Sequence, residues 1–148
     1  MRRRVAVSAF VLASSLVAIN VAKHGTHAQP SDASTAQQAI VEHGQYIVHH
    51  VAMCIYCHSP RSEEGVLDRE QLLQGAPMPV ESPFKGQRWA FRAPKLAGLP
   101  GGWSEEDLIR FLQTGETTTG RAPLPPMPPF RMTERDATAV AAYLKSLQ

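Results

Sequence analysis

Apolar residues recur at helical spacing in three segments of this 148-residue chain. The first segment runs from Gln37 to Met53, the second follows Ser104 and stops at Gly115, and the third follows Thr133. Ser104 and Thr133 are good N-cap residues, and acidic residues follow each of them, where they favour the positive end of the helix dipole. No strand pattern of comparable strength is present, so the sequence predicts an all-α domain.

The N-terminus has a different pattern. Three arginines after Met1 precede an uncharged run from Val5 to Ala22, and Thr26-His27-Ala28 offers small residues where a signal peptidase reads. This order predicts a secretory signal peptide over residues 1–28. An uncleaved membrane anchor is the alternative, because the run is close to the shortest length that spans a bilayer. A flexible leader at 29–36 and one domain at 37–148 would follow.

Removal of residues 1–28 changes the charge. The whole chain is net +2, but four basic residues leave with the signal, so 11 basic residues remain against 13 acidic ones. The mature chain is then about −2 and has no run of consecutive basic residues. Nucleic-acid binding is therefore not expected.

The only two cysteines lie in Cys54-Ile55-Tyr56-Cys57-His58. This spacing is the attachment signature for a c-type haem: two thiols on one helical turn can each add to a haem vinyl group, and the adjacent imidazole can ligate the iron. Haem is attached after export, which agrees with the predicted signal peptide and a periplasmic location. A thiol–disulfide oxidoreductase would also use such a pair but needs a βαβ setting. A zinc site would lack a fourth nearby ligand.

Residues 60–103 are the least regular part of the chain. A short helix is possible at Asp68–Gln74, but five prolines between positions 77 and 100 predict loop. A long loop is unusual in a small domain unless it packs on something else, such as a bound haem. The candidates for that packing, each of which could equally fill the protein core, are Phe84, Trp89, Phe91 and Leu96.

A second axial ligand must lie on the far side of the haem from His58. Met127 is the best candidate, because four prolines around it hold an extended backbone that presents the thioether at little entropic cost. Met78, in a shorter Pro-Met-Pro setting, is the main competitor. Met132 begins the last predicted helix and fits a packing role. Met53 and the remaining histidines lie too close to the attachment motif in sequence to reach the far face; these are His43, His49 and His50.

These motifs resemble those of the class I monohaem c-type cytochromes, over residues 37–148. Gly44 and Tyr46 precede the attachment motif as in that family, and Ala93-Pro94-Lys95-Leu96-Ala97-Gly98 is similar to its Gly-Pro-x-Leu-x-Gly element, with Ala93 in place of the usual glycine. The resemblance implies that the Pro94 carbonyl orients the His58 ring. The Pro-Met-Pro loop and the last helix are most similar to cytochromes that accompany periplasmic dehydrogenases.

The resemblance implies a small helical domain around one covalently bound haem c. Cys54 and Cys57 would attach the haem, and His58 and Met127 would ligate the iron. With both axial positions filled, the expected function is single-electron transfer and not catalysis. A dehydrogenase is the expected donor and a cytochrome or terminal oxidase the expected acceptor, with membrane association possible. A haem enzyme or gas sensor whose Met127 dissociates is the alternative.

Overall fold

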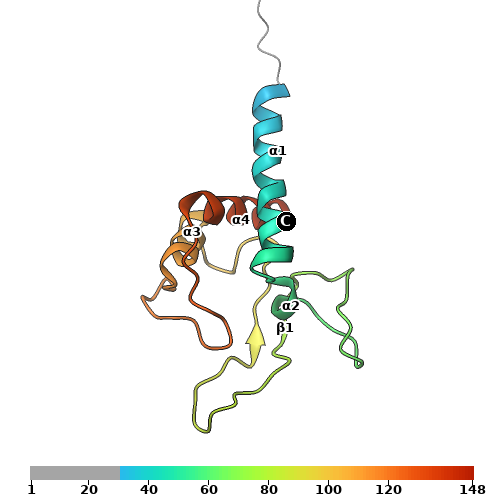
Figure 1. The fold of residues 1–148 in the computed structure, drawn as a ribbon, viewed down its shortest axis with the longest axis vertical. Coiled ribbons are helices and arrows are strands. Elements are labelled where there is room, and N and C mark those ends of the chain that lie inside the picture. The colour runs from blue at the N-terminus through green and yellow to red at the C-terminus, as the bar shows by residue number, and fades with distance from the viewer. Residues whose placement is uncertain (1–30) are drawn as a thin grey trace, which may run out of the picture.

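The computed structural model describes residues 31–148 and contains four α-helices, one π-helical segment and one small antiparallel sheet (Figure 1). The sheet pairs Ala76 with Ala93 and Pro77 with Arg92. The helices and strands are α1 (Ser31–Tyr46), η1 (Ile47–Val51), α2 (Ile55–His58), β1 (Ala76–Pro77), β2 (Arg92–Ala93), α3 (Glu105–Thr114) and α4 (Glu134–Ser146). The small two-residue strands leave the domain essentially all-α, as the sequence predicts.

Helix α1 begins earlier than its apolar pattern. It starts at Ser31, so the structure places residues 31–36 in a helix and not in a flexible leader. These residues are small and polar and include Ala33 and Ala36, which permit a helix without contributing to an apolar face. The predicted signal peptide lies outside the described residues. Within the part that is described, no helix is long and apolar enough to cross a membrane.

The first helical segment does not continue to Met53 as one helix. It passes into the π-helical segment η1 and ends there, because Met53 has a left-handed backbone with φ of 53°. Cys54 then opens a separate turn, α2. The attachment motif therefore lies on its own short helix. The apolar pattern alone would put it at the end of the first helix, because that pattern continues to Met53 without a break.

Helices α1 and α4 cross at Gly44. A Cβ atom at this position would overlap the carbonyl group of Ala139, so only glycine allows the two backbones to approach this closely. Beside the crossing, His43 Nε2 lies 2.8 Å from Asp136 Oδ1 and joins the same two helices. This close approach explains why a glycine, which is unfavourable inside a helix, lies within α1.

The caps of α3 and α4 are those that the sequence predicts. The Ser104 hydroxyl accepts a hydrogen bond from Asp107 N while the Asp107 carboxylate accepts one from Ser104 N, which completes a capping box. Gly115 ends α3 in a left-handed conformation, and Thr133 caps α4. An apolar core lies between the helices, and it includes Ile47, Val48, Leu73, Leu96, Leu108, Phe111, Leu112, Val140, Tyr143 and Leu144.

The region between α2 and α3 is loop apart from β1 and β2. The helix considered for Asp68–Gln74 does not form. Instead Leu73 is fully buried with φ of 62°, its N–H donates to the Ser59 hydroxyl, and its carbonyl accepts hydrogen bonds from Leu96 and Ala97. Burying Leu73 in the core, with its backbone bonded to a distant segment, overrides the weak local helix preference.

Candidate functional site

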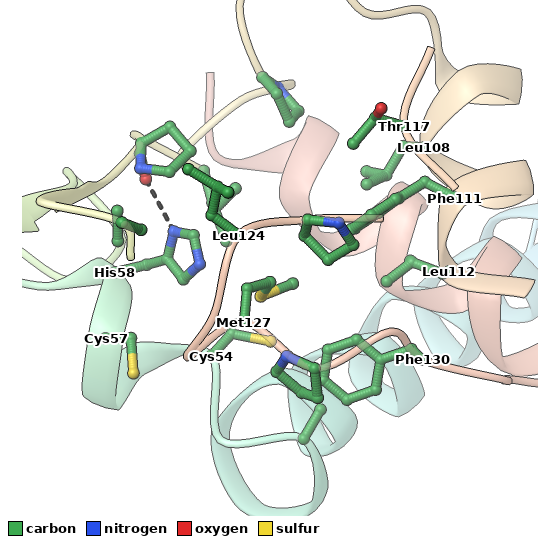
Figure 2. Close-up of a pocket in the computed structure, with 18 of the residues that line it drawn as sticks. Cys54, Cys57, His58, Leu108, Phe111, Leu112, Thr117, Leu124, Met127 and Phe130 are labelled. Carbon is green, nitrogen blue, oxygen red and sulfur yellow. Dashed lines mark hydrogen bonds between the residues drawn. The ribbon is translucent and has the colours of Figure 1, made fainter. Parts of the chain in front are cut away.

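A cavity of about 460 Å³ lies between α2, the 90–96 segment, α3 and the 123–130 loop (Figure 2). Its size is that of a site for a substantial organic ligand. Most of the side chains that line it are apolar, and they come from distant parts of the chain: Leu96, Trp103, Leu108, Phe111, Leu112, Leu124, Phe130, Val140 and Leu144. A large flat apolar group would be sheltered from water here.

The attachment motif forms one wall of the cavity. Cys54, Cys57 and His58 all line it, because α2 is a single turn on which these residues are neighbours. The turn is closed by a hydrogen bond of 2.9 Å from His58 N to the Cys54 carbonyl. Both cysteines are free thiols. The structure thus brings together the three residues that the motif predicts to act together.

The His58 ring is buried and oriented. Its Nδ1 lies 2.8 Å from the Pro94 carbonyl oxygen (Figure 2). A carbonyl can only accept, so Nδ1 carries the proton and the Nε2 lone pair is left free. Burial lowers the pKa of His58, and this outweighs the hydrogen bond to the Pro94 carbonyl, which acts in the opposite direction. A neutral imidazole with a free Nε2 is the form that binds iron.

Cys54 is not arranged as a redox-active thiol. Burial raises its pKa to about 11, and neighbouring Cys57 contributes in the same direction. Attacking cysteines of thiol–disulfide oxidoreductases have lowered pKa values instead. The environment of Cys54 therefore disfavours that alternative.

The 123–130 loop forms another wall. Met127 enters the cavity from this loop and packs partly against the core, with Leu124 and Phe130 beside it. Its backbone is fixed by a hydrogen bond of 3.2 Å from Met127 N to the Leu124 carbonyl. Figure 2 shows the His58 ring and the Met127 side chain entering the cavity from separate segments.

Two further methionines reach the cavity. Met53 is 44% exposed and adjoins Cys54, whereas Met78 lies at the edge where β1 leads into the following loop. Neither belongs to the set of side chains packed against the core, and Met127 does. The three histidines of α1 and η1 are absent from the lining. Two of them form hydrogen bonds with residues of α4. His43 pairs with Asp136, and His49 Nε2 lies 2.7 Å from the Tyr143 hydroxyl.

Only one of the four loop side chains expected to pack on a haem lines the cavity. Leu96 does so, whereas Phe84 is 68% exposed, Phe91 is 92% exposed, and the Trp89 indole donates to the Val80 carbonyl. For Phe84, Trp89 and Phe91 the expectation is wrong, because these three side chains lie outside the lining, although their neighbours Ala90 and Arg92 belong to it. Apolar character alone does not show which way a loop side chain faces.

Other lining residues come from segments that sequence reasoning treated as ordinary helix or loop. Trp103 stacks edge-on against Phe111, with ring centroids 5.3 Å apart, and both face the cavity. Thr117 and Arg92 supply polar groups. In the sequence, only the apolar face of α3 indicated that this segment is buried. That pattern does not distinguish a face that packs on α4 from one that packs on a ligand.

Comparison with known proteins gives a match to the cytochrome c family over residues 41–148. The chain belongs to the cytochrome c family. Membership implies a covalently bound haem c, and the cavity fits one: two thiols and a neutral imidazole on one wall, a thioether on another, and apolar side chains between them.

Three relatives are similar over 70–75% of the chain. They are the fructose dehydrogenase cytochrome subunit of Gluconobacter japonicus (29% identical), the gluconate 2-dehydrogenase cytochrome c subunit of Pantoea cypripedii (30%) and a diheme cytochrome c-type protein of Cereibacter sphaeroides (28%). The chain covers only 21%, 27% and 34% of their respective lengths. It is therefore similar to one part of each, and the chain is a c-type cytochrome similar to those that accompany dehydrogenases.

Proposed function

We propose that this protein carries single electrons between protein partners by means of one haem c, attached through Cys54 and Cys57 and ligated by His58 and Met127. The observation that carries the proposal is the shared cavity. It places the attachment motif on one wall and a proline-braced methionine on another, with apolar side chains filling the space around them.

The residues around the cavity have separate roles in this proposal. Thioether bonds from both cysteines would keep the haem bound in a dilute compartment. Pro94 holds His58 in the tautomer whose Nε2 can ligate. Met127 would be the second protein ligand to the iron, which would leave no open position for oxygen or peroxide. The bound haem supplies a reversible one-electron couple, and methionine opposite histidine favours the reduced form and a comparatively high potential.

The apolar lining limits structural change during the redox cycle. The apolar side chains of Leu108, Phe111 and Phe130 offer water no hydrogen-bond partner, so with haem bound few solvent dipoles would need to reorient when the charge changes. The core behind them is close-packed and does not adjust easily. A rigid, dry site is suited to fast electron transfer and offers no acid–base pair for substrate chemistry.

The partners follow from the relatives. Two relatives are named as dehydrogenase cytochrome subunits, so we propose a dehydrogenase as the electron donor and a cytochrome or terminal oxidase as the acceptor. The basic and then uncharged start of the sequence supports export to the periplasm, where haem is attached, with membrane anchoring as the variant of this proposal.

The test is a count of haem and electrons in the purified exported protein. Intact mass under denaturing conditions should show one covalently added haem, and a potentiometric titration should show a single one-electron wave. A second haem, a colourless protein or haem lost on denaturation would each contradict the proposal.

A further inference from the structure

The loop between β1 and β2 extends away from the helices (Figure 1). Its returning end reaches the cavity, where Ala90 and Arg92 belong to the lining. We call residues 78–95, which are this loop together with β2 and the two residues after it, the basic arm. Its sequence contains four basic residues and one acidic residue, Glu81, and no acidic residue follows until Glu105. The rest of the chain from residue 29 carries 12 acidic and seven basic residues. Within residues 29–148 the arm is thus a positive segment in an otherwise negative stretch. Its basic residues are Lys85, Arg88, Arg92 and Lys95.

These four side chains are all exposed. Among the described residues, the ion pairs join His43 to Asp136, Arg110 to Asp107 and Lys145 to Glu105, and none involves the arm. No internal carboxylate neutralises the arm, so its positive potential is directed to solvent, where it can attract an acidic surface.

The arm also exposes aromatic surface. Phe91 and Phe84 are 92% and 68% exposed, although many buried positions exist in this domain. Aromatic side chains and arginine are the residues enriched at the centres of protein interfaces. Aromatic and basic residues follow one another along the arm, so its surface offers a partner both apolar contacts and positive charges around them.

The arm has a defined conformation beside the cavity. Met78 N donates to the Phe91 carbonyl, Trp89 Nε1 to the Val80 carbonyl, and the Ser82 hydroxyl to Gln87 Oε1. Ala90 N donates to the Pro125 carbonyl at 2.8 Å, which ties the arm to the loop that carries Met127.

The arm also supplies part of the cavity rim, through Met78, Ala90 and Arg92. A protein that covers the arm therefore also covers this side of the cavity.

We infer that the basic arm is the docking surface for an acidic face of the protein with which this cytochrome exchanges electrons. The inference rests on the proposed electron-transfer function and adds where, and with what chemistry, the partner binds. Positive and aromatic segments also bind anionic membranes. The protein partner is favoured because the arm forms part of the cavity rim, where electron exchange requires a redox centre to approach.

The test uses the reduced holoprotein and two small oxidants of opposite charge, hexacyanoferrate(III) and tris(phenanthroline)cobalt(III). Each oxidant takes one electron from the protein. The double variant Lys85→Gln/Arg88→Gln should slow oxidation by the anion about fivefold at low ionic strength and speed oxidation by the cation, and both effects should vanish at high salt.

The matched control is Arg69→Gln/Arg135→Gln, which makes the same change in net charge at exposed positions outside the arm. Its rates should stay close to those of the original protein. Poly-L-glutamate, an acidic polypeptide probe, should protect the original protein from hexacyanoferrate but not the arm variant. Equal rates in both double variants, or protection that survives loss of the arm charges, would overturn the inference.

Vesicles that contain phosphatidylglycerol test the membrane alternative. If the original protein sediments with them and Phe91→Ser does not, the arm is a membrane contact and the protein assignment fails. These failures differ from failure of the proposed function, in which the protein would carry no haem and neither oxidant would report an electron.

Discussion

His58 and Pro94 are joined by a hydrogen bond of 2.8 Å that connects the haem attachment turn to a segment 36 residues further along the chain. The Pro94 carbonyl fixes which ring nitrogen holds the proton. The backbone near Pro94 is itself fixed. Gly75 packs tightly against the backbone of residues 93–95, and Leu96 N donates a hydrogen bond to the Leu73 carbonyl. The loop between α2 and α3 therefore serves to orient one imidazole.

Removal of the cysteines one at a time should separate attachment from ligation. Cys54→Ala and Cys57→Ala should each keep haem through the remaining thioether, because each cysteine lines the cavity independently. The double variant should lose covalent haem. Intact mass under denaturing conditions measures this, and covalent haem in the double variant would show that the attachment residues are elsewhere.

Gly44→Ala should destabilise the domain by roughly 2 kcal/mol, because the added methyl group would overlap the Ala139 carbonyl at the crossing of α1 and α4. Denaturant unfolding of the holoprotein gives the free energy. Gly101→Ala is the matched control, since a Cβ atom at Gly101 meets nothing within 4 Å. Equal free energies of unfolding for the two variants would contradict the close packing of Gly44 on Ala139.

Asp136 should make stability depend on pH in the acid range. Its hydrogen bond with His43, and more weakly that with Thr133, lowers its pKa below the ordinary value of 3.8. The unfolded chain then binds a proton more readily, so this contribution is fully present above pH 3.8 and is lost as the pH falls through the lowered pKa.

Acid unfolding curves check this prediction. Asp136→Asn should be less stable than the original protein near neutral pH, and the difference should shrink below pH 3.8. Glu134→Gln, on the same helical turn and outside the ion pair, accounts for the general effect of removing one negative charge. A difference between the original protein and Asp136→Asn that is constant with pH would contradict the assignment.

The helices and their caps could be predicted because their signals are local. Ser104, Gly115 and Thr133 act within one turn of the chain, and Gly44 breaks helix propensity in a way that suggests close contact. The attachment motif is also local, since its three residues share one turn. The helix break at Met53 carries no such signal, because the left-handed conformation of a methionine is imposed by its surroundings.

The loops were harder to predict, because their side chains are directed by contacts distant in sequence. Leu73 is not helical, and its carbonyl accepts hydrogen bonds from Leu96 and Ala97. Phe91 faces solvent, although an aromatic residue in an apolar stretch would be expected to pack inside the protein. Alternating small, basic and aromatic residues have no period that marks an inner and an outer face. Only the tertiary structure shows that this loop borders the cavity and does not fill it.

The absorption spectrum of the oxidised protein tests the His58 and Met127 ligand pair most directly, through the charge-transfer band that a methionine–iron bond produces. The proposal predicts this band in the original protein and in Met78→Ala, and its loss in Met127→Ala together with a fall in reduction potential. Met78 is the matched control because it also lines the cavity. A band that survives Met127→Ala and disappears in Met78→Ala would contradict the ligand assignment.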